Sequence, residues 1–182
     1  MLTEATEGNA SNASTPPTIP VSHHGGVDLD ELFDAWDRAW SGRDPKGFES
    51  ICNPDVHYED PLTESPLIGT RRLAKHARQL WKALPDARVN STGKRLSNGT
   101  FVANPCRILG THLGEVGRIH PTKKALEVHA VVYAELDEEQ RFFRVRAFYD
   151  VYSAAIDLGV LPKPGTAGER AMLMLRGFGL RG

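Results

Sequence analysis

The sequence predicts an α+β fold in which helices near the N-terminus precede a largely antiparallel sheet. Three observations support this prediction. Apolar residues recur at helical spacing in the first half of the chain, around 29–40 and 70–84. Apolar and polar residues alternate in the second half, most clearly over 125–136. Ser97-Asn98-Gly99 is typical of the turn that joins two strands of a hairpin.

The composition indicates one domain with flanking segments. The chain has 182 residues, 40% of them hydrophobic, which is enough for one sizeable core. A net charge of -1 provides neither a broad basic field for nucleic acid nor a polybasic surface for a membrane, so we expect a small-molecule or protein partner. Cys52 and Cys106 lack metal-ligand spacing and are typical of a reduced, cytoplasmic protein.

We divide the chain into three parts. Residues 1–26 are rich in Ser, Thr, Asn, Pro and Gly and contain no signal peptide or membrane span, so we expect a disordered tail. Residues 27–162 form the domain. Residues 163–182 form a C-terminal helical extension, which begins after the stiff break Pro162-Lys163-Pro164-Gly165.

The first two helices lead into a strand. Asp28 is placed to cap a helix whose apolar face contains Trp36 and Trp40. Both indoles are expected in the core, and the same face would line a cavity on that side. A short helix over 45–51 then precedes a strand that ends at Asp60.

The strand that ends at Asp60 carries the main candidate for chemistry. Val56, Tyr58 and Asp60 share its apolar face, because side chains alternate along a strand. An ionised carboxylate on an apolar face loses hydration, which favours exchange of protons with a bound molecule. Asp60 is therefore a candidate general base. Asp60-Pro61 is also common turn chemistry, and this alternative remains open.

The third helix supplies a candidate partner for Asp60. After a loop over 63–69, residues 70–84 place His76 on the same apolar stripe as Leu73 and Leu80. His76 is therefore expected to point inward. It is either a histidine whose hydrogen bonds are satisfied within the core or a catalytic partner of Asp60.

Strands are expected over 87–96, 101–111, 125–136 and 141–149. In the third of these, the even positions from Leu126 to Leu136, including Val132, form the inner face, and His129 points outward. In the fourth, the apolar set is Phe143, Val145, Ala147 and Tyr149, with Tyr149 as its polar tip.

Several local strings resemble a known superfamily. Tyr58-Glu59-Asp60-Pro61, followed by Ser65-Pro66 and Gly69-Thr70, is similar to the segment that carries the general base of ketosteroid isomerases. Other strings look like SnoaL-like polyketide cyclases: Gly110-Thr111-His112-Leu113-Gly114, Pro121-Thr122, and Tyr149-Asp150 before Asp157-Leu158-Gly159-Val160-Leu161-Pro162. By their order, residues 29–162 resemble these two branches of the nuclear transport factor 2-like superfamily.

The resemblance implies a cone-shaped barrel, in which a curved, mainly antiparallel sheet and three N-terminal helices surround a deep apolar pocket. It assigns the general base to Asp60 and a cavity position to His76. Val132 stands where isomerases have the acid that stabilises an oxyanion, and Ala147 stands where the cyclases have their catalytic aspartate. Both would contact the substrate, but the oxyanion-stabilising acid and the cyclase aspartate are missing.

Two further polar residues have more than one interpretation. Asp150 matches an aspartate common in SnoaL-like sequences, and it could equally cap a helix over 151–158. His112 lies at a strand end between two glycines, either as a structural feature of that turn or as a polar group at the cavity mouth. These two join the expected substrate-binding set of Trp36, Trp40, Tyr58, Val132, Ala147 and Tyr149.

We therefore expect an enzyme of the isomerase or lyase type that acts on an apolar, polycyclic molecule of steroid, terpenoid or polyketide character and needs no metal or other cofactor. Asp60 would abstract a proton next to a carbonyl group and return it or leave it with His76. One alternative is a non-catalytic ligand-binding or assembly module of the same fold. The other is a SnoaL-like cyclase that uses Asp150.

The C-terminal extension is expected to contact a partner surface. Over 169–176, Met172, Leu173 and Leu175 lie close together, with Phe178 following. So short an apolar helix is unstable in water and should pack on another surface. It would cover the mouth of its own barrel as a lid, or brace a second subunit on the outer sheet near His129, Val131 and Tyr133. The resemblance implies sheet-to-sheet dimers, so we expect a homodimer.

Overall fold

The computed structural model describes residues 28–175, so the expected tail over 1–26 and Phe178 lie outside the described residues. The helices are α1 (Leu29–Gly42), α2 (Gly47–Ile51), α3 (Thr70–Ala83), α4 (Val151–Asp157) and α5 (Ala167–Leu175). The strands are β1 (Cys52–Glu59), β2 (Leu67–Ile68), β3 (Arg88–Ser91), β4 (Leu96–Ser97), β5 (Phe101–Thr111), β6 (Ala125–Leu136) and β7 (Phe142–Tyr149). Among the described helices, none combines the length and the apolar character needed to cross a bilayer.

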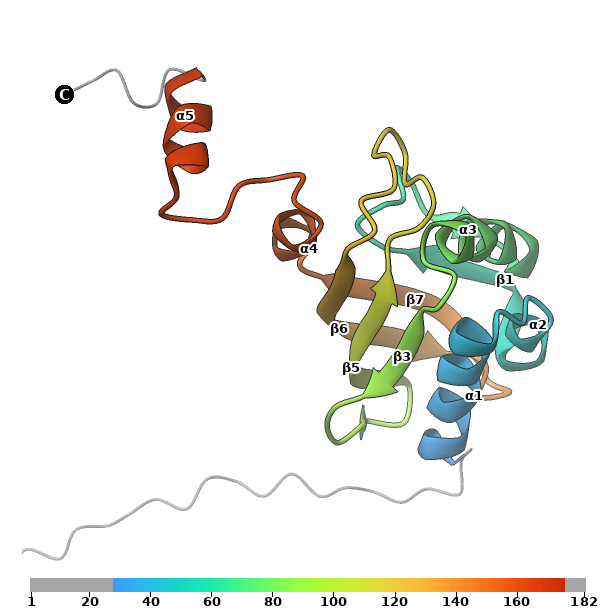
Figure 1. Cartoon of the computed structure of the whole chain (residues 1–182). Coiled ribbons are helices and arrows are strands. Elements are labelled where there is room, and N and C mark those ends of the chain that lie inside the picture. The colour runs from blue at the N-terminus through green and yellow to red at the C-terminus, as the bar shows by residue number, and fades with distance from the viewer. Residues whose placement is uncertain (1–27, 176–182) are drawn as a thin grey trace, which may run out of the picture.

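The strands form one sheet with the order β2-β1-β7-β6-β5-β3, and β4 pairs with β5. Neighbouring strands from β3 to β7 are antiparallel, whereas β1 runs parallel to β7. Helices α1, α2 and α3 lie against one side of the curved sheet (Figure 1). The predicted α+β class is therefore confirmed. The sheet is open, with β2 and β3 at its edges, rather than a closed barrel.

Helix α1 begins where the sequence predicted. The Asp28 carboxylate accepts hydrogen bonds from the backbone N–H groups of Asp30 and Glu31, at 2.9 and 3.4 Å. These bonds satisfy N–H groups that have no partner within the first turn of a helix. The apolar face of α1 then packs on the sheet, and the Trp36 ring lies 5.2 Å from that of Phe142.

The predicted inner faces of β1 and β6 are confirmed. Val56, Tyr58 and Asp60 are 0%, 3% and 8% exposed, so the face that ends at Asp60 is buried. In β6, every even position from Leu126 to Leu136 is buried and His129 is exposed. Alternation of side chains alone decides both faces, because a strand of this kind has one side on the core and one in water.

The expected inner face of the last strand is wrong at one position. Phe142 is fully buried, and Phe143 is half-buried with its ring 5.8 Å from the outward-facing His57. The pairing of β6 with β7 shifts register between Glu135 and Leu136. A register irregularity of this type changes which residues face inward, and strict alternation cannot anticipate it.

The strand expected over 87–96 is interrupted. Residues 92–95 leave the sheet between β3 and β4, and the Arg95 side chain turns towards α1. Its guanidinium nitrogens lie 3.0, 2.6 and 3.6 Å from carboxylate oxygens of Asp30, Asp34 and Asp37. Only 8% of the Arg95 side chain is exposed, but the Asp30 and Asp34 side chains are 77% and 54% exposed, so of these three pairs it is the one with Asp37 that is shielded from water. Contacts with α1 thus override the local preference for a strand.

The loop after β5 is held by a close approach to α3. The backbone N–H groups of Leu113 and Gly114 both donate to the Ala83 carbonyl oxygen, at 2.9 and 3.1 Å. A Cβ atom on Gly114 would lie 2.1 Å from the carbonyl oxygen of Lys82, which only glycine avoids. The Gly110–Gly114 string therefore fixes this loop against the helix.

The C-terminal helices differ in how they contact the domain. Leu158, directly after α4, packs with Leu126 and Val128. Helix α5 has no buried residue and lies apart from the sheet (Figure 1). Its expected role as a lid or brace therefore stays a prediction.

The Asp37 carboxyl group should make the stability of the protein depend on pH. Burial raises its pKa from 3.8 to about 6, against the opposing effect of Arg95, with a smaller rise from Asp34. A folded pKa above the unfolded one favours folding at low pH, and this contribution is lost as pH rises from about 4 through 6. The loss corresponds to ~3 kcal/mol. We expect Asp37→Asn to melt several degrees above the wild type at about pH 7.5 and to lose that advantage at about pH 4.

Thermal melts of both proteins at the two pH values measure this effect. Asp34→Asn removes a more exposed carboxylate from the same arginine and serves as the control. An Asp37→Asn variant that is less stable than the wild type at both pH values would show that the ion pair with Arg95 outweighs the cost of burying the charge.

Candidate active site

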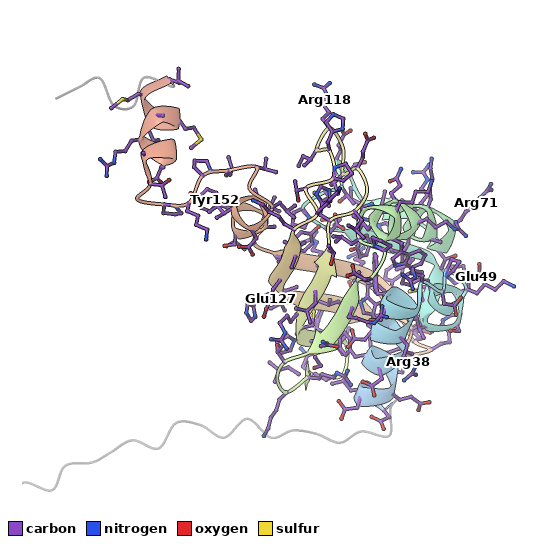
Figure 2. All side chains as sticks on the ribbon, viewed as in Figure 1. Arg38, Glu49, Arg71, Arg118, Glu127 and Tyr152 are labelled. Atoms are coloured by element: carbon purple, nitrogen blue, oxygen red, sulfur yellow. The ribbon has the colours of Figure 1, made fainter. Side chains whose placement is uncertain are left out.

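A cavity of about 130 Å³ lies between the helices and the sheet. Its wall is almost entirely apolar, with polar atoms from Asp60 and a few aromatic residues. Charged side chains such as Arg71 on α3 and Glu127 on β6 lie on the outside of the molecule (Figure 2). The lining residues are Trp36, Trp40, Tyr58, Asp60, Leu80, Trp81, Leu84, Ala87, Val89, Cys106, Ile108, Leu126, Val128, Ala130, Val132, Ala147, Tyr149 and Ala154.

Packed tryptophans limit the size of the cavity. The Trp36 and Trp40 rings lie 6.0 Å apart, and the Trp81 indole N–H donates to the Trp40 carbonyl oxygen at 2.9 Å. An apolar cavity of ~150 Å³ is large enough to take up benzene. The observed volume therefore corresponds to a single ring, which is smaller than the polycyclic substrate that we expected from the sequence.

The Asp60 carboxylate lies in the cavity wall and accepts three hydrogen bonds. The Tyr58 hydroxyl donates to Oδ2 at 3.0 Å, and His76 Nε2 lies 2.7 Å from the same oxygen. The backbone N–H of Leu62 donates to Oδ1 at 2.8 Å. Hydrogen bonds to a charged acceptor are stronger than those between neutral groups, so these three bonds fix the position of the carboxylate.

One lone pair of Asp60 remains available. A carboxylate has two lone pairs on each oxygen, and Oδ2 uses both on Tyr58 and His76. Oδ1 uses one on Leu62, so the remaining pair is on Oδ1. The bond from Leu62 is an Asx turn, which means that Asp60 serves as a turn residue and as a cavity carboxylate at once.

Tyr58 is suited to act as a permanent donor to Asp60. Burial, and then the charge of Asp60, raise the pKa of Tyr58 well above its ordinary value. The hydroxyl therefore stays protonated at neutral pH and keeps its hydrogen bond.

His76 contacts Asp60, but it does not belong to the described residues that line the cavity. Its side chain is 11% exposed, and its ring packs on Tyr58 with the centroids 5.7 Å apart. When Asp60 is ionised, Nε2–H is the donor in this pair. The inward direction expected for His76 is observed, and its position is that of a residue that orients Asp60 from behind.

Other residues that we expected to bind substrate fall into two groups. Trp36, Trp40, Tyr58, Val132, Ala147 and Tyr149 all line the cavity. His112 and Asp150 do not line it. The lining also includes Ile108, Trp81 and Ala154, which the sequence analysis did not single out.

His112 is held in its turn by hydrogen bonds that involve its backbone and Nδ1. It is fully buried, and the Thr122 backbone N–H donates to its Nδ1 at 3.2 Å. Its own backbone groups bond to Lys124 and Lys123 across the loop. These contacts support the structural alternative for His112 rather than a place at the cavity mouth.

Asp150 caps helix α4. One oxygen accepts a hydrogen bond from the Ser153 backbone N–H at 3.0 Å, and the other bonds to the Ser153 hydroxyl. The hydrogen bonds from the Ser153 hydroxyl and backbone hold the pKa of Asp150 below its ordinary value. Its position therefore agrees with the helix-cap alternative.

Comparison with known proteins shows which family the sequence matches. Residues 30–158 match the model of the SnoaL-like polyketide cyclase family. No curated protein matches the sequence. Among solved structures, AclR, a proposed hydroxylase from Streptomyces galilaeus, is similar with a TM-score of 0.64 at 19% identity over 81% of this chain and 91% of that chain.

Two other solved structures are similar to the same degree. IdmH, a proposed polyketide cyclase from Streptomyces antibioticus, has a TM-score of 0.62 at 17% identity, over 71% of this chain and 97% of that chain. A hypothetical protein with a ketosteroid isomerase-like fold from Catenulispora acidiphila, in complex with trimethylamine, has a TM-score of 0.61 at 17% identity. The match covers 71% of this chain and 92% of that chain. At these identities the likeness supports the fold alone.

Both cysteine thiols should be unreactive in the folded protein. Cys52 and Cys106 are each 1% exposed, and burial raises the pKa of Cys106 to about 12. Because the thiolate is the reactive form, we expect no reaction with the bulky anionic disulfide DTNB at about pH 8. Absorbance should report both thiols only after denaturation. Release of one equivalent from the native protein would mean that the wall beside Cys106 opens to solvent.

Proposed function

The chain belongs to the family of SnoaL-like polyketide cyclases, and from this membership we propose that it is a cofactor-independent acid/base enzyme that isomerises or cyclises an apolar small molecule. The observation that carries the proposal is Asp60, a carboxylate in the wall of an otherwise apolar cavity. Such a group is costly to bury, and a carboxylate held by several donors in the wall of a cavity is typical of a catalytic base.

Asp60 acts as the general base. Its free lone pair on Oδ1 takes a proton from the carbon next to a substrate carbonyl, and the electrons of that C–H bond form an enolate. Tyr58 and His76 hold Oδ2, so the carboxylate has a fixed orientation towards the bound molecule. A positioned base of this kind contributes roughly 10²–10⁴-fold to a rate.

The enolate has two possible fates with the same groups. Return of the proton from Asp60 to another carbon of the conjugated system completes an isomerisation. Attack of the enolate carbon on a second carbonyl of the same molecule forms a carbon–carbon bond and an alkoxide, and the proton held by Asp60 passes to that alkoxide to complete an aldol cyclisation. Asp150 lies outside the cavity wall, so we assign it no part in either reaction.

A second candidate is a ligand-binding module that retains the cavity without the chemistry. The small cavity volume and the tryptophans in its wall favour this candidate. Fold and family membership do not decide between the two, because related folds host both activities.

Replacement of Asp60 distinguishes the two candidates. We expect Asp60→Asn to lower turnover by roughly 10²–10⁴-fold while the protein remains folded. The amide would place an N–H opposite one of the donors to Asp60, at a cost of about 1–3 kcal/mol in stability. Turnover of a cyclic ketone and a thermal melt measure the two effects.

Asp150→Asn is the matched control, since it makes the same chemical change at an exposed helix cap where asparagine caps equally well. It should leave turnover unchanged. Equal turnover by the wild type and Asp60→Asn would refute the role of Asp60 as base and favour the ligand-binding module.

We also propose that two copies of the chain pair through the outer face of the sheet. Phe101, Val131, Tyr133 and Phe148 are all 39–54% exposed on the central strands. The Phe101 and Tyr133 rings stack at 5.9 Å, and Val131 pairs with Phe148 across β6 and β7. A continuous apolar strip of this kind is typical of an interface, and a second copy offers the same strip.

Charges on this strip should dissociate the pair. We expect Val131→Glu combined with Phe148→Glu to halve the mass in sedimentation equilibrium without loss of the fold, because two buried carboxylates would oppose each other across the interface. Leu113→Glu, at an exposed apolar residue of the loop after β5, should leave the mass unchanged. A wild-type protein that already sediments as a monomer contradicts the proposal.

A further inference from the structure

The proposed reaction leaves one charge without a partner. Removal of a proton next to a carbonyl places negative charge on the carbonyl oxygen, and enzymes stabilise such an oxygen with a positioned donor. Val132, in the cavity wall, has only apolar side-chain atoms and cannot donate a hydrogen bond. Tyr58 already donates its hydroxyl proton to Asp60. The cavity therefore needs another donor near Asp60.

Tyr149 lies where such a donor is needed. In the parallel pair of β1 and β7, Tyr58 is opposite Val145 and Glu59 is opposite Arg146, so Asp60 follows beside Ala147. Tyr149 is two residues further along β7 on the same face, and both lie in the cavity wall. From the spacing of strands and residues in a sheet, the Cα atoms of Asp60 and Tyr149 are roughly 8 Å apart.

The Tyr149 hydroxyl is available as a donor. None of the hydrogen bonds within residues 28–175 involves its oxygen, whereas the Tyr58 hydroxyl is committed to Asp60. Burial, and then the charge of Asp60, raise the pKa of Tyr149 above its ordinary value. The group is therefore protonated at neutral pH and can donate to an acceptor that enters the cavity.

We propose that the Tyr149 hydroxyl donates a hydrogen bond to the carbonyl oxygen of the substrate and to the oxyanion formed from it, and that the substrate presents a six-membered cyclic ketone to Asp60. This inference rests on the proposed function and specifies its substrate class. The ketone ring occupies the cavity of about 130 Å³, and any further part of the molecule stays outside. A carbonyl oxygen only accepts hydrogen bonds, so it suits a wall in which the Tyr149 hydroxyl can donate one.

The step balances without a further reactant. Asp60 Oδ1 takes one α-proton, the C–H electrons form the carbon–carbon double bond of the enolate, and the carbonyl π electrons move to oxygen. Tyr149 keeps its proton and shares it in a hydrogen bond. In D₂O the Asp60 carboxyl group exchanges its proton with solvent and returns deuterium, so the ketone gains deuterium at its α-carbon.

Cyclohexanone labelled with ¹³C at the carbonyl tests the proposal in two ways. With the wild type, the carbonyl resonance should move downfield on binding, as it does when a carbonyl oxygen accepts a hydrogen bond. The α-hydrogens should exchange with D₂O faster than they do in the same D₂O buffer without protein. Tyr149→Phe should lose the downfield shift and lower the exchange rate roughly 10²–10³-fold. Tyr152→Phe, at an exposed tyrosine of α4, is the control and should change neither.

The outcomes separate this inference from the proposed function. Asp60→Asn should retain the carbonyl shift and lose the exchange. A shift that depends on Tyr149 without any exchange by the wild type supports the donor and refutes the base. A shift that persists in Tyr149→Phe, or no binding of cyclohexanone, overturns the inference. Displacement of cyclohexanone by 2-adamantanone, a cage wider than one ring, overturns the limit to a single ring.

Discussion

The Asp60 carboxylate is a charged group in an apolar cavity, and its stability there depends on donors from separate parts of the chain. Tyr58 comes from the same strand, Leu62 from the turn that follows, and His76 from α3. A buried polar group that loses its hydrogen bonds costs several kcal/mol. The turn after β1, the register of Tyr58 and the packing of α3 on the sheet are therefore linked through one side chain, and a displacement of any of them would remove a hydrogen bond from Asp60.

The parallel pairing of β1 with β7 gives this carboxylate its neighbours. Because both strands run in the same direction, the end of β1 lies beside the C-terminal part of β7, where Ala147 and Tyr149 face the cavity. The antiparallel β6 then contributes Ala130 and Val132 from the other side of β7. The polar groups thus gather at one end of a wall that is otherwise apolar. Tryptophans from α1 and α3 lie in the helical part of the same wall, together with Leu80.

A second buried carboxylate, Asp37 of α1, has a different set of partners. Asp37 is close to Arg95, but the ion pair at 3.6 Å does not fully offset the loss of hydration, and the pKa of Asp37 rises to about 6. Asp60 has three direct hydrogen bonds to its carboxylate, whereas Oδ1 of Asp37 has none among the described residues. The two buried carboxylates therefore differ in how many of their oxygens accept hydrogen bonds, and the carboxylate with an unpaired oxygen is the one in the ion-pair cluster with Arg95.

The sequence by itself determined which residues share a face. The spacing of Trp36 and Trp40, the alternation along β6, and the inward direction of Asp60 and His76 follow from the repeats of a helix and a strand, which are local properties. Short sequence strings, such as the one around Asp60, were also enough to identify the family. Tertiary structure decided the burial of Phe142, the departure of Arg95 from the sheet, the place of His76 behind Asp60, and the free hydroxyl of Tyr149. Each of these depends on contacts between residues far apart in the chain, and periodicity contains no information about such contacts.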